Sequence, residues 1–153
     1  MEELEGAKLY HDKHQRCVYC DMVDQEYKDN DRIVTENDDF VVFCPFVPRY
    51  PFECWVLPKK HISDFASLTG QEQIYFAAIL RETLWRIRQC LSDSSYNFYL
   101  HISPINENRQ ESFHWHVEIV PKLTEPTGFE WGTGFYVVRT APNMAAKYLR
   151  EVE

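Results

Sequence analysis

Two histidines and a glutamate stand at every second position of the segment ESFHWHVEIV, residues 111–120. Successive side chains of an extended chain point to opposite faces, so His114, His116 and Glu118 would share one face. The residues that alternate with them are apolar and are predicted to point into the core: Phe113, Trp115, Val117 and Ile119. A row of two imidazoles and a carboxylate can line an active site or bind a metal, but it can also be a partly buried polar face.

A second chemical motif is the pair Cys17 and Cys20, separated by two residues. This spacing lets two thiolates bind one metal ion, with Zn–S distances of about 2.3 Å. The same spacing occurs in redox sites and by chance, but a thioredoxin-like redox motif follows a strand, and no strand is predicted before Cys17. The spacing therefore favours zinc. Two further ligands are then needed, and His61 and the paired histidines are the candidates.

The paired histidines leave three interpretations open. If one of them binds the metal, the other stays free on the same face and could act as a nucleophile or a base near neutral pH. Alternatively, both bind metal, or both only form hydrogen bonds. The spacing alone does not choose among these roles.

Length and charge limit the classes of function. A chain of 153 residues fits one domain with a substantial core. The net charge of −8 argues against a nucleic-acid-binding protein, which needs a basic surface. An acidic protein that handles a phosphate ester must meet the anion locally, with a metal, histidines or backbone N–H groups.

The cysteines and the apolar segments indicate the compartment. No apolar run is long enough to span a bilayer, and residues 1–16 contain no apolar signal core. Five cysteines without a secretion signal indicate a reducing compartment, so a cytoplasmic protein is expected. The cysteines outside the pair are predicted core residues: Cys44, Cys54 and Cys90.

The pattern of apolar residues and turn signals predicts an α+β fold, an antiparallel sheet with one long helix on one face. The predicted extended segments are 33–46 (a hairpin around Asn37), 52–60, 96–103 and 111–120, and residues 127–139 are predicted to supply a glycine-rich turn and a last strand. The long helix is predicted within 67–93, where Thr69 and Glu72 form a capping-box pattern. Its buried face is expected to contain Ala77, Leu80, Leu84, Ile87 and Leu91. A short helix within 141–152 is predicted to end the chain.

Four segments taken together resemble the galactose-1-phosphate uridylyltransferase branch of the histidine-triad superfamily: CVYCDMV, PFECWVLPKKHISDF, HWHVEI and GFEWGTGFY. They are similar to the second of that enzyme's two homologous halves, over nearly the whole chain from Cys17 onward. The resemblance implies a half-barrel of antiparallel strands that pairs with another half. We therefore expect an N-terminal extension over 1–16, a single domain over 17–153, and a homodimer that covers the exposed sheet edge.

The resemblance also implies chemistry. It implies nucleotidyl transfer on nucleoside diphosphate sugars or sugar phosphates through a covalent nucleotidyl-histidine, with His116 in the nucleophile's place. The implied zinc ligands are Cys17, Cys20, His61 and His114. The implied substrate contacts are Asn97, Gln110, Ser112 and Glu118.

Several departures from the family pattern keep two other functions open. Trp115 stands where the nucleophile-bearing half has proline, and Glu118 stands where small histidine-triad hydrolases have a third histidine. The loop INENRQES lacks the glycines that bring backbone N–H groups against a phosphate. In full-length enzymes the first half carries the nucleophile, and in some members the histidines matching His101, His114 and His116 bind a separate metal. The alternatives are a nucleotide-phosphate hydrolase and a non-catalytic, zinc-stabilised half that completes a partner's active site.

Overall fold

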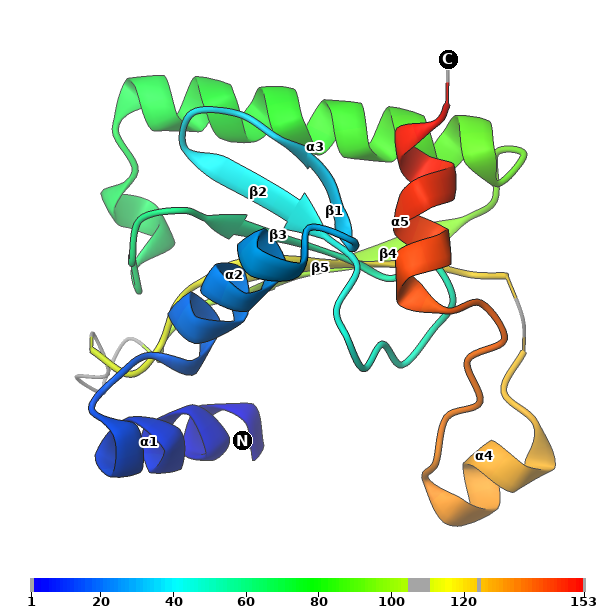
Figure 1. The fold of residues 1–153 in the computed structure, drawn as a ribbon, viewed down its shortest axis with the longest axis horizontal. Coiled ribbons are helices and arrows are strands. Elements are labelled where there is room, and N and C mark those ends of the chain that lie inside the picture. Colours follow the sequence, from blue (N-terminus) through cyan, green and yellow to red (C-terminus); the bar gives the residue numbers. More distant parts are fainter. Residues whose placement is uncertain (1, 105–110, 124, 153) are drawn as a thin grey trace.

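The computed structural model describes residues 2–104, 111–123 and 125–152 (Figure 1). Five strands form one antiparallel sheet in the order β1-β2-β3-β5-β4. The strands are β1 (Ile33–Glu36), β2 (Phe40–Phe43), β3 (Cys54–Pro58), β4 (Tyr96–His101) and β5 (His116–Pro121). The helices are α1 (Glu2–His14), α2 (Val18–Asp29), a 3-10 turn (Phe65–Ser67), α3 (Gly70–Cys90), α4 (Gly128–Thr133) and α5 (Pro142–Arg150). The predicted α+β fold is confirmed.

The hairpin β1–β2 forms where the turn signal predicted it. The side-chain oxygen of Asn37 accepts hydrogen bonds from the backbone N–H groups of Phe40 at 2.9 Å and Asp39 at 3.2 Å. An asparagine that bonds to the backbone two and three residues on holds a tight turn. All four residues of β2 are then buried, because helices cover both faces of this part of the sheet.

Helix α3 begins at the predicted capping box. The hydroxyl of Thr69 accepts from the backbone N–H of Glu72 at 3.3 Å, and the Glu72 carboxylate accepts from the N–H of Thr69 at 2.7 Å. The predicted buried face was wrong in part, since Ala77 is exposed and the buried residues are Ile79, Thr83 and Ile87. A threonine can be buried here because its hydroxyl donates to the carbonyl of Ile79 at 2.8 Å.

Two apolar clusters lie on opposite faces of the sheet. Helices α3 and α5 cover the first, which contains Trp115, Val117 and Ile119. Helices α1 and α2 cover the second, which contains Phe113. Phe113 was predicted to share a face with Trp115, and this is wrong. Regular strand geometry begins only at His116, so the alternation does not extend back to Phe113, which packs against the ring of Tyr19.

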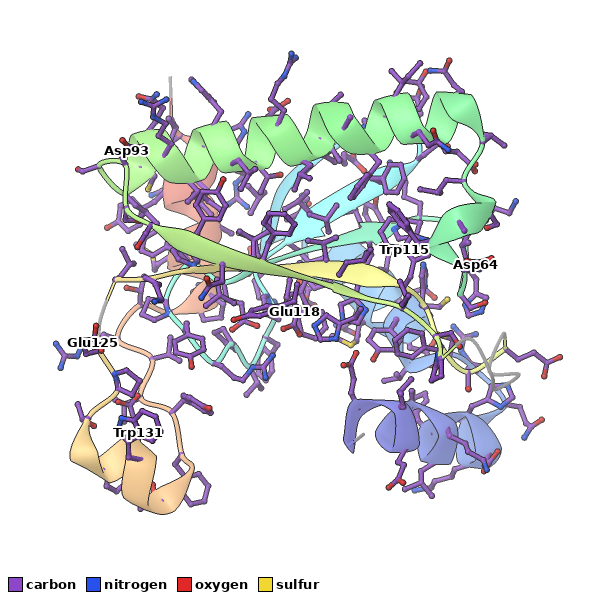
Figure 2. All side chains as sticks on the ribbon, turned by 180° about the vertical axis from the view of Figure 1, so that it is seen from behind. Asp64, Asp93, Trp115, Glu118, Glu125 and Trp131 are labelled. Atoms are coloured by element: carbon purple, nitrogen blue, oxygen red, sulfur yellow. The ribbon has the colours of Figure 1, made fainter. Side chains whose placement is uncertain are left out.

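The last strand predicted within 127–139 is also wrong. Thr127 and Glu130 form a second capping box, which begins α4, and Gly134 ends the helix with a left-handed backbone at φ 72°. The Glu130 carboxylate also accepts from the backbone N–H of Val137 at 3.0 Å, which folds the following segment back on the helix. Helix α4 projects from the sheet, with the Trp131 side chain 79% exposed (Figure 2).

Strand β4 forms the edge of the sheet beside β5, and α3 packs mainly over β1, β2 and α5 instead. Apolar residues on both faces of β4 therefore stay exposed: Tyr96, Phe98, Tyr99 and Leu100. Among the described residues, no helix is both long and apolar enough to cross a membrane.

Candidate metal and catalytic site

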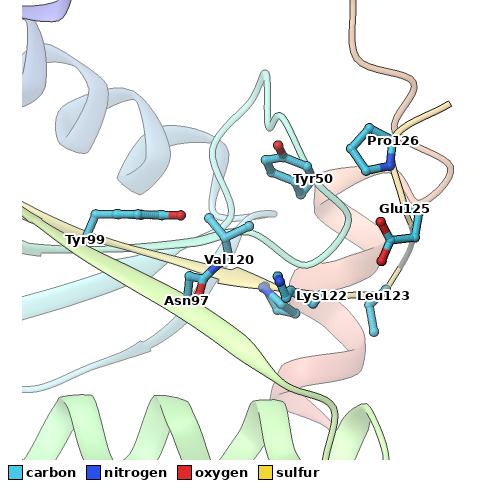
Figure 3. Close-up of a pocket in the computed structure, with 9 residues that line it drawn as sticks. Tyr50, Asn97, Tyr99, Val120, Lys122, Leu123, Glu125 and Pro126 are labelled. Carbon is cyan, nitrogen blue, oxygen red and sulfur yellow. The ribbon is translucent and has the colours of Figure 1, made fainter. Parts of the chain in front are cut away.

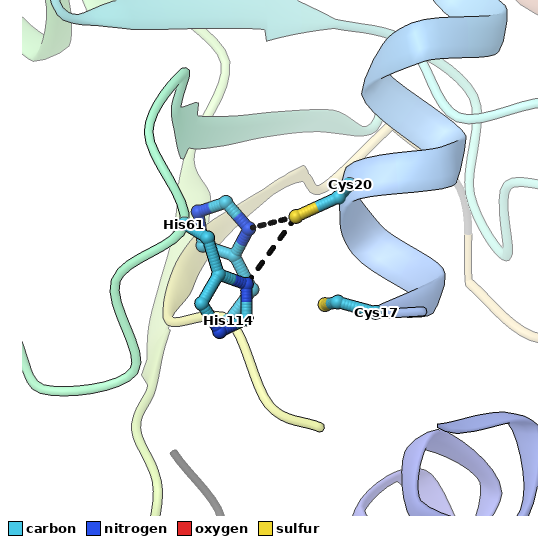
Figure 4. A group of neighbouring side chains, drawn as sticks. All are labelled: Cys17, Cys20, His61 and His114. Carbon is cyan, nitrogen blue, oxygen red and sulfur yellow. Dashed lines mark hydrogen bonds between the residues drawn. The ribbon is translucent and has the colours of Figure 1, made fainter. Parts of the chain in front are cut away.

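The four predicted zinc ligands meet at one point of the structure (Figure 4). The sulfur and nitrogen atoms that Cys17, Cys20, His61 and His114 offer all lie within 4.8 Å of one another. The Cys20 Sγ atom is 3.3 Å from His61 Nδ1 and 3.6 Å from His114 Nδ1. Two sulfurs and two imidazole nitrogens are the ligand set of structural zinc sites.

Three separate segments bring these ligands together. Cys17 stands immediately before α2 and Cys20 lies in its first turn, three residues on, so both sulfurs can face the same side. His61 follows β3 in a loop. The backbone N–H of Trp115 donates to the carbonyl of Ile62 at 3.0 Å, which ties this loop to the segment that enters β5. The site therefore connects α2 to the sheet.

The electrostatics of the cluster favour a cation. Hydrogen bonding to the Cys20 thiol lowers the pKa of Cys17 despite burial, and the imidazoles of His114 and His61 lower it further. The Cys17 sulfur in turn raises the pKa of Cys20, so the pair alone holds one thiolate. Burial lowers the pKa of His114, which favours the neutral imidazole that a metal requires. These donors fit zinc in number and chemistry.

A second cluster lies next to the first and contains Glu3, His101 and His116. Glu3 comes from α1. Its carboxylate accepts from Tyr19 Oη at 2.6 Å, bonds to His101 Nδ1 at 2.8 Å and lies 3.2 Å from His116 Nε2. Glu3 was not among the predicted site residues. Helix α1 is polar along most of its length, so nothing in its pattern distinguishes this carboxylate from its neighbours.

His116, the predicted nucleophile, has no exposed surface. Its Nδ1 atom is 3.1 Å from the backbone carbonyl of His114, and its ring stacks on His101 at 4.7 Å and on Trp55 at 5.1 Å. The Nδ1–H group can donate to that carbonyl, which leaves Nε2 as the ring nitrogen available for chemistry. The nitrogen suited to attack therefore faces Glu3 and lies beneath α1.

Glu118, predicted to contact substrate, is paired within the chain. Its Oε2 atom accepts from a guanidinium nitrogen of Arg49 at 2.6 Å and lies 3.5 Å from His101 Nε2. Burial by itself would raise the pKa of Glu118. His101 and Arg49 lower this pKa by more than burial raises it, so the carboxylate stays charged. The loop of Arg49 is held by the buried Glu53, whose carboxylate accepts from the backbone N–H of Arg49 at 2.7 Å.

The pairing of His101 predicts a pH dependence of stability. The carboxylates of Glu118 and Glu3 raise its pKa from 6.5 to about 9. Because the folded-state pKa is raised, protonated His101 contributes its whole stabilisation of the fold below pH 6.5. This contribution is lost as the pH rises through 9 and the imidazole loses its proton. Urea unfolding at pH 6 and pH 9 should show a loss of about 1–2 kcal/mol, after allowance for solvent screening. The His101→Gln variant should lose less over this interval, and an equal loss would contradict this origin.

Asn97 lies at a cavity of about 290 Å³ on the β4–β5 part of the sheet (Figure 3). Its side-chain neighbours there include Tyr50, Tyr99, Lys122 and Glu125. Asn97 pairs with Val120 across the two strands, and Tyr99 pairs with Glu118 in the same register. Because alternate residues share a face, Asn97 lies on the same face as Glu118 and His116.

The other two predicted substrate contacts are less informative. Ser112 is buried, two residues before His114. Gln110 lies outside the described residues. Substrate contacts stay predictions for all four residues: Asn97, Gln110, Ser112 and Glu118. The division of the chain at residue 17 also stays a prediction.

Known proteins resemble the chain over its whole length. It is 36% identical to the ADP-glucose phosphorylase of Arabidopsis thaliana over 151 residues, which cover 97% of this chain and 42% of the relative. It is 27% identical to the galactose-1-phosphate uridylyltransferase of Thermotoga maritima, over 99% of this chain and 49% of the relative. The chain thus spans about half the length of these relatives.

Solved structures of related proteins have the same fold as this chain. The Arabidopsis thaliana ADP-glucose phosphorylase crystallised with bound ADP-glucose superposes with a TM-score of 0.87 at 36% identity, over 98% of this chain and 48% of that one. A zinc-bound histidine-triad protein from Mycobacterium smegmatis shares the fold, with a TM-score of 0.59 at 19% identity, over 88% of this chain and 90% of that one. The family described as "Galactose-1-phosphate uridyl transferase, C-terminal domain" matches residues 3–130. The chain therefore belongs to this family of uridyl transferase C-terminal domains.

Proposed function

We propose that this chain takes part in nucleotidyl transfer between a nucleoside diphosphate sugar and a phosphate or sugar phosphate, as a zinc-stabilised domain. One observation carries the proposal. Within a domain of this family, a complete Cys–Cys–His–His ligand set stands two residues from a further imidazole, that of His116. The relatives named above include an ADP-glucose phosphorylase and a uridylyltransferase, which supports a nucleotide sugar as substrate.

Zinc would be held by Cys17, Cys20, His61 and His114. When bound, the metal supplies a fixed point that joins α2, the loop after β3 and the segment before β5. Its ligand His114 is thereby fixed in orientation, and so is the backbone carbonyl to which His116 Nδ1 bonds. A reducing compartment such as the cytoplasm would keep both thiols available, since all five cysteines are free.

The chemical step would occur at His116. Its Nε2 lone pair attacks the α-phosphorus of the nucleotide sugar, a P–N bond forms, and the bond to the leaving sugar phosphate breaks. An oxygen of phosphate or of an acceptor sugar phosphate then attacks the same phosphorus and releases the imidazole. The cavity at Asn97 suits the nucleoside, because Tyr50 and Tyr99 offer aromatic faces and Asn97 an amide for hydroxyl groups.

Burial of His116 favours a second candidate function. The ring is covered on all sides, and its Nε2 atom faces a carboxylate instead of open space. A histidine held in this way suits a structural role, in a half that completes the active site of another half.

Labelling separates the two functions. After incubation with ADP-glucose or UDP-glucose labelled in the α-phosphate, the first function predicts acid-labile label on the wild-type chain and none on His116→Ala. His14→Ala, at an exposed position of α1, is the matched control and should label normally. Label that survives His116→Ala would remove His116 from the role. Absence of label on the wild type would favour the structural half.

We also propose that β4 pairs with a second copy of the chain. Its free edge and exposed apolar side chains need a cover, and a second sheet edge would provide one. Light scattering after size exclusion should give a dimer. Phe98→Asp on β4 should give a monomer, whereas Ile74→Asp, equally apolar and exposed but on α3, should not. A wild-type monomer at micromolar concentration would contradict the proposal.

A further inference from the structure

Helix α1 covers the face of the sheet that contains His116, yet few apolar contacts hold it there. Ala7 is the buried apolar residue of α1, and Leu4 is partly buried against the same cluster. Most other described side chains of α1 are exposed and many are charged. A helix with little buried apolar surface separates from its support at low cost in free energy.

The polar contacts of α1 are concentrated at Glu3. One carboxylate bonds to Tyr19 at 2.6 Å and His101 at 2.8 Å, and it lies 3.2 Å from His116. At the other end, Tyr10 donates to Asp21 of α2 at 2.9 Å. Burial by itself would raise the pKa of Glu3. Its interactions with His101, His116 and Tyr19 lower this pKa by more than burial raises it, so the Glu3 carboxylate is charged at neutral pH.

Glu3 also closes the approach to the imidazole. Two sides of the His116 ring are occupied by the stacked rings of Trp55 and His101, and Nδ1 is occupied by the carbonyl of His114. The remaining nitrogen, Nε2, faces Glu3. A reagent in solution can therefore reach this nitrogen only after Glu3 moves, and Glu3 moves with α1.

We propose that α1 is a displaceable cover over His116, and that Glu3 is the residue that holds it closed. The inference deepens the function proposed above, because a nucleophilic His116 would require the cover to open before substrate binds. The same cover would keep His116 unreactive in a chain that acts only as a structural half. Exposure of the imidazole can be measured without turnover, so failure of the cover and failure of nucleotidyl transfer are separate results.

The test is acylation of histidines by diethyl pyrocarbonate, followed by mass spectrometry of each peptide, on the zinc-loaded full chain. In Glu3→Gln, we expect His116 to react about tenfold faster than in the wild type, since charged hydrogen bonds that hold the closed state are lost. The matched control is Glu5→Gln, an exposed position on the same helix, which should react at the wild-type rate. His14 is exposed and serves as the internal standard.

Three results would overturn the proposal. The first is an equal rate at His116 in Glu3→Gln and the wild type. The second is a wild-type rate already equal to that of the exposed His14. The third is a second bound metal in the wild type that Glu3→Gln lacks, because Glu3 would then be a ligand and not a latch. If Glu3→Gln fails to fold, Tyr19→Phe removes one bond to Glu3 and keeps the ring, and it should give a smaller increase.

Discussion

Serine in place of Cys17 is expected to empty the metal site and to lower the melting temperature by on the order of 10 °C or more. The reason is the separation of the ligands along the chain. Cys17 and Cys20 precede or begin α2, His61 follows β3, and His114 precedes β5, so the unfolded chain does not present them together. The free energy of zinc binding is therefore largely free energy of folding.

The measurement is elemental analysis of the purified chain together with calorimetry. The wild type should contain about one zinc per chain, and Cys17→Ser should contain almost none. Cys90→Ser is the matched control, since Cys90 is a partly buried thiol on α3 outside the ligand set, and it should keep the metal. His116→Ala should also keep the metal. Loss of zinc in His116→Ala would make that imidazole a ligand and would end its assignment as nucleophile.

Local patterns were sufficient to predict most of the elements. The hairpin depends on hydrogen bonds between Asn37 and residues just after it, and the start of α3 depends on hydrogen bonds between Thr69 and Glu72. Both are contacts within a few residues, so the sequence alone predicted these two features. Cys17 and Cys20 were also predicted to bind a metal, because their spacing is shared with redox sites but no strand was predicted before Cys17. Their partners, His61 and His114, came from the family resemblance, and the structure brings all four together.

The errors came from competition between local and distant interactions. The segment after Gly134 has the aromatic and β-branched residues of a strand, but it lies outside the sheet, beside a helix set by Thr127 and Glu130. The role of Glu3 was not predictable at all, because it depends on how α1 packs across the sheet, and α1 has almost no apolar pattern. Burial of His116 depends on the same packing.

Alanine in place of Trp115 is expected to lower the free energy of unfolding by about 3–5 kcal/mol. Its side chain has no exposed surface, and its ring lies 4.9 Å from that of Phe65, 5.4 Å from Phe76 and 5.9 Å from Phe40. Removal of the indole leaves a cavity among these rings, and aromatic side chains cannot collapse far to fill it. Urea unfolding followed by circular dichroism measures the loss.

The same tryptophan decides what its two neighbours can do. Because the Trp115 ring is packed into the cluster beneath α3, the adjacent His114 and His116 are directed to the other side of the chain, toward the metal ligands and α1. Trp115→Phe keeps most of the ring contacts, and we expect a cost below about 1.5 kcal/mol. Trp131→Ala, at an exposed position of α4, should change stability by less than about 0.5 kcal/mol. Equal losses in Trp115→Ala and Trp131→Ala would show that the buried ring at 115 stabilises the fold no more than an exposed tryptophan does.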